Sequence, residues 1–194
     1  MQGHTHALFG LTTMAAVNYA TGFVQPHIVR DIPTGAAVCA GAAIFGALLP
    51  DIDANESTIK NELGLAGKIF SGILRLVGVK HRGLTHWGIT ALAVVVAAVA
   101  LGNAFGWPDA GLAFGLGYLS HILPADAMTI SGVPLLWPRE KAFHLLPGPL
   151  RMRTGGPVEM LVFWGLATGL VFLLPDLLPE VWRVIQTIGR GCLF

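Results

Sequence analysis

The chain has 194 residues, enough for one domain, and we treat residues 1–194 as a single unit. Hydrophobic residues make up 54% of it and charged residues only 12%, whereas a soluble domain normally carries about 25% charged residues. This composition excludes an ordinary soluble protein and favours an integral membrane protein. The net charge of +1 argues against stable binding of nucleic acid.

Five apolar segments follow one another along the chain. The strongest, 88–107, contains no charged side chain and has about the 20 residues that a membrane-spanning helix needs. The segment 7–24 is weaker because polar side chains interrupt it, and 110–123 is so short that it would cross only obliquely or pair with a neighbour. We therefore predict an all-α integral membrane bundle of four to five spans. The five segments are 7–24, 32–50, 88–107, 110–123 and 160–175.

The connections between these segments predict the orientation. With five spans, the N-terminus and the two long connections, 51–85 and 125–157, lie on one side and carry nine of the twelve Lys and Arg residues. Positive residues mark the cytoplasm, so we expect this side to be cytoplasmic. Within the first connection, the amphipathic pattern of 66–79 predicts a helix that lies in the membrane interface or packs on the bundle from the cytosol.

Histidines and acidic residues stand at the ends of the predicted helices that share this side. Each alone has a simple explanation as a frayed terminus, a turn or a helix cap. Neighbouring helix ends lie within about 10 Å, so together they should converge on one cytoplasm-facing site. His121 stands out because ionisable residues within spans are usually functional. The candidates are His4, His6, Asp51, Asp53, His81, His86, His121, Asp126 and Glu159.

Histidine with carboxylates, and no cysteine pair at metal-binding spacing, indicates a divalent metal site for Zn²⁺ first, with Mn²⁺ or Fe²⁺ as alternatives. Such a metal lowers the pKa of water, and two or three metals would clamp both oxygens of a phosphate ester. Asp126 or Glu159 would act as a ligand or general base, and Arg82 would stabilise developing negative charge. The candidate catalytic residues are thus Arg82, Asp126 and Glu159. The candidate metal ligands are His4, His6, Asp51, Asp53, His81, His86, His121 and, again, Asp126.

Four motifs resemble the YdjM type of bacterial inner-membrane protein, a family described as metal-dependent hydrolases, some of them LexA-regulated. That resemblance implies an inner-membrane location and, for some members, a role in the DNA damage response. The family is distantly similar to the all-α zinc-dependent phospholipase C and single-strand nuclease group, which implies phosphoester hydrolysis by analogy. The motifs are His4-Thr5-His6, LLPDID at 48–53, HRGLTHW at 81–87, and GYLSH at 117–121 leading to SGVPLLWP at 131–138.

One spacing departs from that family pattern, in which an acid follows the histidine by four residues. Here Asp126 follows His121 by five residues. In a regular helix five residues are about 140° apart, against about 40° for four. A break or bulge at Pro124 would be needed to bring the carboxylate back to the imidazole.

Two hypotheses follow from the sequence. The first is a membrane-bound hydrolase that acts at the cytoplasmic face on a small-molecule or lipid phosphoester, with the bilayer as its other partner. The second is a non-enzymatic membrane protein, either a metal carrier or a scaffold, in which the polar cluster joins helix ends. A carrier should place ionisable groups along a path through the midplane. The predicted positions at one end of the bundle favour the first hypothesis.

Overall fold

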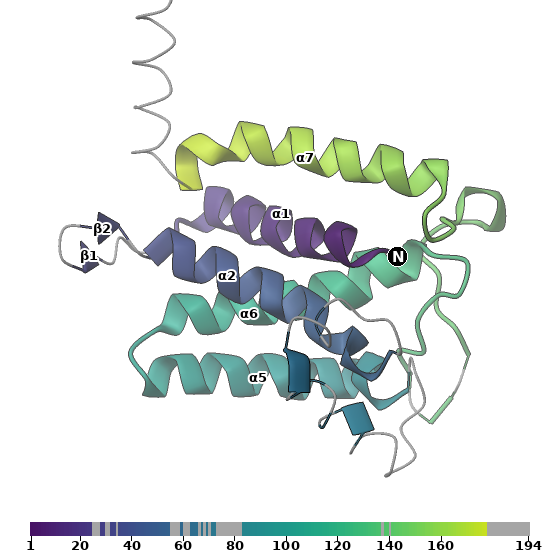
Figure 1. The fold of residues 1–194 in the computed structure, drawn as a ribbon, viewed down its shortest axis with the longest axis horizontal. Helices are drawn as coiled ribbons and strands as arrows, with labels where there is room; N and C mark the ends of the chain where they lie inside the picture. The colour runs from purple at the N-terminus through teal and green to yellow at the C-terminus, as the bar shows by residue number, and fades with distance from the viewer. Residues whose placement is uncertain are drawn as a thin grey trace, which may run out of the picture.

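Among the residues that the structure describes, five helices lie side by side in a computed structural model of the chain (Figure 1). Each coincides with one of the apolar segments, so the predicted all-α class is confirmed. The five helices are α1 (Gly3–Thr21), α2 (Gly35–Leu48), α5 (Gly88–Ala104), α6 (Pro108–Ser120) and α7 (Pro157–Leu177). The structure describes residues 1–24, 28–29, 32–33, 35–54, 59, 63–65, 67, 69, 71–72, 83–136, 138–139 and 141–177.

Short elements connect the helices. Two strands of two residues each form an antiparallel pair between α1 and α2. Single turns of 3-10 or π-helix directly follow α2 and α6 and directly precede α5. These elements are β1 (Ile28–Val29), β2 (Ile32–Pro33), η1 (Leu49–Asp53), η2 (Leu84–His86), η3 (His121–Ala125), η4 (Asp126–Met128) and η5 (Gly148–Leu150).

Helix α6 lies at the centre of the bundle. It packs against α1, α2 and α5, and α7 packs against α1. Glycines let α2 and α6 meet backbone to backbone: a Cβ added to Gly117 would overlap the carbonyl oxygen of Ala43, and one added to Gly46 would overlap that of Phe114. Small residues favour such close approach of helices in membranes. This contact fixes the end of α2 beside the end of α6.

Successive helices run in opposite directions, so one end of the bundle collects several chain segments. The starts of α1, α5 and α7 and the ends of α2 and α6 lie together at the end marked N (Figure 1). The β1–β2 pair lies at the opposite end. The five-segment topology predicted this arrangement, which brings the polar helix ends to one side.

Two of the described helical stretches are long and apolar enough to cross a membrane, Gly35–Ile52 and Pro157–Leu177, and α5 is a shorter apolar helix. Only 6% of the second stretch counts as buried within the protein, so its residues are otherwise exposed or half-buried. The count of four to five spans stays a prediction. The amphipathic helix expected at 66–79 falls largely outside the described residues.

Candidate metal centre

Three imidazoles and two carboxylates meet where the helix ends converge. His86 Nε2 lies 3.3 Å from Asp126 Oδ2 and 3.8 Å from Asp51 Oδ1. His121 Nε2 lies 3.6 Å from Asp51 Oδ1 and 3.9 Å from Asp126 Oδ2. His6 Nε2 lies 3.8 Å from a carboxylate oxygen of each aspartate. We call these five residues the His/Asp cluster.

The cluster contains two overlapping groups of potential metal ligands. One is His6, His121 and Asp126, and the other is Asp51, His86 and His121. Within each group the ligand atoms all lie within 4.8 Å of one another. The Nε2 atoms of His86 and His121 are 3.3 Å apart, which is close for two nitrogens unless they share a proton or a metal. These five donors could therefore hold a metal ion.

Burial of the cluster is uneven. The three histidines are fully buried and Asp126 is 1% exposed. The side chain of Asp51 is 25% exposed, so the cluster opens to its surroundings on the Asp51 side. Burial lowers the pKa of His86 and outweighs the hydrogen bond and charge of Asp126, which raise it. The His86 ring therefore favours the neutral form, which is the form that binds metals.

Hydrogen bonds from outside the cluster orient two of its rings. His121 Nδ1–H donates to the carbonyl of Ala47 at 2.6 Å, which leaves Nε2 directed at the cluster. The Nδ1 of His86 is 2.9 Å from Thr85 Oγ1, and Tyr118 OH donates to the Thr85 carbonyl at 2.6 Å. The sequence gives no sign of the Ala47 contact, because it involves only a backbone oxygen. Tyr118 precedes His121 by three residues, and this helical spacing is a sequence signal that places it beside the cluster.

His6 differs from the other two rings. Both of its nitrogens are buried, and neither has a hydrogen-bond partner within the described part of the chain. Its ring stacks on that of His121 with centroids 3.8 Å apart and an angle of 13°. Buried polar atoms are normally satisfied, so an orphaned imidazole facing two carboxylates is what a missing metal would leave. The residues present fit a divalent metal.

The irregular spacing of His121 and Asp126 is accommodated by a kink within η3. Leu123 leaves helical geometry, with φ −131° and ψ 109°, and Pro124 follows it. The Asp126 N–H donates to the His121 carbonyl across five residues. Because the chain is kinked here, Asp126 returns to the face of His121, and its Oδ2 lies 3.9 Å from His121 Nε2. The bulge expected at Pro124 is present and carries Asp126 into the cluster.

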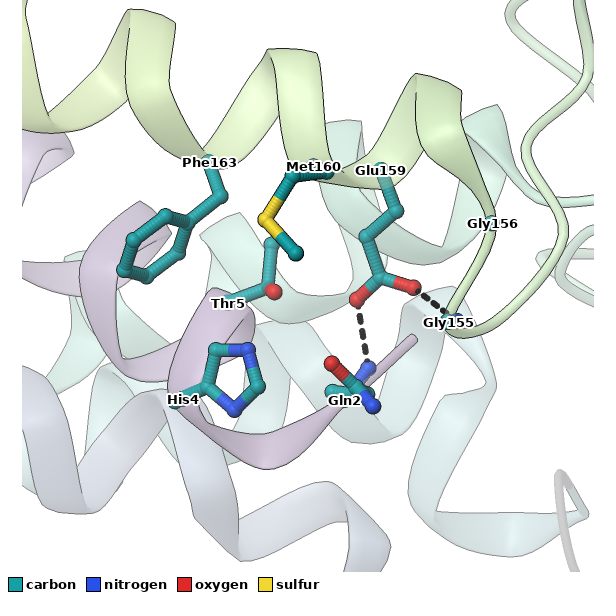
Figure 2. Close-up of a pocket in the computed structure, with 8 residues that line it drawn as sticks. All are labelled: Gln2, His4, Thr5, Gly155, Gly156, Glu159, Met160 and Phe163. Carbon is teal, nitrogen blue, oxygen red and sulfur yellow. Dashed lines mark hydrogen bonds between the residues drawn. The ribbon is translucent and has the colours of Figure 1, made fainter.

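Two sequence candidates lie outside both groups of potential ligands. His4 faces α7, where its ring meets Phe163 edge-on at 5.3 Å (Figure 2). Residues two apart on a helix point about 200° apart, so His4 and His6 cannot face the same side. Glu159 is 2% exposed and its carboxylate accepts backbone hydrogen bonds instead. The candidates His81 and Arg82, and the side chain of Asp53, lie outside the described residues.

The fold and the cluster define a helical membrane protein with a buried His/Asp group that could hold a metal ion. The chain belongs to the YdjM family of inner membrane proteins, whose pattern it matches over residues 1–178. It is 38% identical over 143 residues to Inner membrane protein YdjM of Escherichia coli (strain K12), covering 72% of this chain and 67% of that protein. The resemblance and the inner-membrane location predicted from the sequence are thereby confirmed.

The similarity extends beyond the enteric bacteria. Inner membrane protein YdjM of Shigella flexneri matches with the same identity and coverage as the Escherichia coli protein. Protein YvsG of Bacillus subtilis (strain 168) is 30% identical over 168 residues, covering 86% of this chain and 89% of that protein. No solved structure matches this chain.

Proposed function

We propose that this protein is a membrane-bound, metal-dependent hydrolase of a phosphate ester or phospholipid. One observation carries the proposal. Three imidazoles and two carboxylates lie within contact distance in a largely buried site, and one imidazole has no hydrogen-bond partner for either nitrogen among the described residues. Such a donor set without sulfur suits Zn²⁺, with Mn²⁺ and Fe²⁺ as alternatives. When bound, the metal supplies Lewis acidity, which lowers the pKa of water and polarises a phosphoryl oxygen.

The residues divide into two roles. His6, His86, His121 and Asp126 are buried and act as ligands. Asp51 is the ligand that reaches the open side, so substrate and water approach past it. Phosphoester hydrolysis comes from the analogy with the all-α zinc hydrolases, and the separation of buried and open ligands supports it.

We further propose that the cluster faces the cytoplasm in a bundle of four to five spans. The cations Arg139, Lys141, Arg151 and Arg153 follow the cluster in the same connection, between α6 and α7. An excess of positive residues beside the ends of spans favours the cytoplasmic side. A substrate would then reach the Asp51 side from the cytoplasm or from the inner leaflet.

The alternative functions have less support. A metal carrier needs ionisable groups along a path through the bundle, whereas the elements that carry the His/Asp cluster meet at one end of the helices. A scaffold that used the cluster only to join helix ends would satisfy its buried polar atoms, and the two nitrogens of His6 have no hydrogen-bond partner in the described part of the protein.

Elemental analysis of the detergent-purified protein tests the proposal, together with hydrolysis of p-nitrophenyl phosphate and of phospholipid vesicles. We expect stoichiometric zinc in the wild type and loss of both metal and hydrolysis in His86→Ala. His4→Ala is the matched control, because it removes a histidine at the same end of the bundle that lies outside the cluster and contacts Phe163 instead. Full metal content and activity in His86→Ala would overturn the assignment. A wild type without metal would favour the alternative function as a scaffold.

A further inference from the structure

Glu159 occupies an unusual position at the start of α7. Its carboxylate is 2% exposed, and among the described residues no cationic side chain forms an ion pair with it. One oxygen accepts the N–H of Gly155 at 2.8 Å, which is a local bond at the start of its own helix. The other accepts the N–H of Gln2 at 2.7 Å, across 157 positions of sequence (Figure 2). The second bond ties α7 to the beginning of α1.

Gln2 is the N-cap of α1, and its side chain makes no capping bond. Its carbonyl accepts the N–H groups of Thr5 and His6, each at 3.1 Å. A helix start without a capping side chain frays more readily. The anchor that fixes this turn therefore comes from Glu159, which holds the N–H of the same residue whose carbonyl holds His6.

The ring of His6 depends on this backbone anchor more than the other two imidazoles do. His86 and His121 are each oriented by a hydrogen bond at Nδ1, whereas His6 has none within the described part of the chain. Its ring stacks on that of His121, and the direction of its Nε2 depends on packing and on the placement of the α1 backbone. A shift of the first turn of α1 would move this ligand directly.

The recess beside Glu159 supports a role in joining helices rather than in holding substrate. It is a partly open recess of about 20 Å³, lined in part by Thr5, Met160 and Phe163 (Figure 2). Pockets for small-molecule ligands are roughly 300–1,000 Å³. The carboxylate in this recess has both oxygens committed to backbone N–H groups.

We infer that Glu159 is a positioning residue: through the amide of Gln2 it fixes the first turn of α1 and holds His6 in the metal cluster. This inference rests on the proposed metal site for its effect on metal binding. The bond from the Gln2 N–H to the Glu159 carboxylate, which we call the clamp, is a property of the metal-free protein. Supporting groups around metal ligands change metal affinity by about 10- to 100-fold. Glu159→Gln should therefore weaken zinc binding about 10-fold.

A mutant cycle on the full-length, detergent-purified protein tests the route through His6. Zinc affinity is measured by competition with a chromophoric chelator. In a His6→Ala background, Glu159→Gln should have no further effect, because the ligand that it positions is gone. In a Thr85→Ala background, where the perturbed ligand is His86, the two losses should multiply. An equal loss in every background would mean that Glu159 acts on general stability and would overturn the inference.

Gln2→Pro supplies a second, independent variant. Gln2 has φ −76°, which proline adopts readily, so the substitution removes the N–H donor and keeps the carbonyl. We expect Gln2→Pro to weaken zinc binding as much as Glu159→Gln, with no further loss in the double variant. Gln2→Ala keeps the N–H and should bind zinc like the wild type. Normal affinity in Gln2→Pro would contradict the clamp.

Amide hydrogen exchange of the metal-free protein separates the clamp from the metal site. In Glu159→Gln and Gln2→Pro, the peptide covering residues 3–8 should exchange faster than in the wild type, while peptides from α5 stay unchanged. Unchanged exchange in residues 3–8 would overturn the positioning role. If the wild type binds no zinc but the variants still exchange faster in residues 3–8, the proposed function is refuted and the clamp is supported.

Discussion

The substitution Asp126→Asn removes one negative charge from the His/Asp cluster with almost no change in side-chain volume. Asp126 Oδ1 lies 3.8 Å from His6 Nε2, and Asp126 Oδ2 lies 3.3 Å from His86 Nε2. The carboxylate is 1% exposed, so water cannot replace it as a ligand without a rearrangement. We expect the variant to fold and to bind zinc more weakly.

The expected loss can be worked out from the number of donors. Structural zinc sites provide about 10–16 kcal/mol of binding free energy. Shared among five donors, this is about 2–3 kcal/mol for each, or about a 30- to 200-fold change in Kd. A carboxylate should lie toward the upper end of that range, because its charge faces the cation in a site with little solvent screening.

Competition with a chromophoric chelator measures this change, and Asp109→Asn is the matched control. Asp109 is also a buried aspartate of the same helical segment, in the first turn of α6. It precedes His121 by twelve residues, about 18 Å along a helix. We expect Asp109→Asn to bind zinc like the wild type. A folded Asp126→Asn protein whose Kd stays within about twofold of the wild type would show that Asp126 is not a ligand.

Three further predictions concern the surroundings of the cluster. Thr85→Ala should weaken zinc binding about 10-fold through the lost contact at His86 Nδ1, whereas Thr85→Ser should not, as chelator competition will show. Gly117→Ala should lower the free energy of unfolding by about 1–3 kcal/mol, because its methyl group meets the Ala43 carbonyl. Gly165→Ala, where a Cβ has open space, should not lower stability when both variants are compared by thermal unfolding, because alanine is the better helix former. Zinc at about 100 times its Kd adds about 2.7 kcal/mol of stability. That should raise Tm by about 5–11 °C, reversibly by EDTA, and an unchanged Tm would argue against binding to the folded state.

Most of the fold could be predicted from the sequence, because each long helix needs an uninterrupted apolar surface. The segment 88–107 became α5 (Gly88–Ala104), and 160–175 became α7 (Pro157–Leu177). The bounds differ by a few residues because helix ends depend on local bonds rather than on hydropathy. In α1, the left-handed Gly22 ends the helix before the apolar segment does.

The cluster was predictable only in outline. Alternating helix directions identify the end at which the donors gather, but not which side chains face inward. In the sequence motif, His4 and His6 are equally good candidates for a metal ligand. The packing of α1 against α6 and α7 determines which of the two faces the cluster. The carbonyl of Ala47 and the amide of Gln2 have no side-chain signature, so no sequence pattern could show their part in the site.

The spacing of His121 and Asp126 shows how a departure in sequence can preserve an arrangement in space. A spacing of four residues is what an α-helical turn requires to place an acid beside a histidine. Here the spacing is five, and the chain is kinked at Leu123 within η3, where the Asp126 N–H donates to the His121 carbonyl. The carboxylate therefore lies 3.9 Å from the imidazole in spite of the longer spacing. Ligand sets of this kind should therefore be compared by the face that the residues share, since the number of residues between them can change with the type of turn.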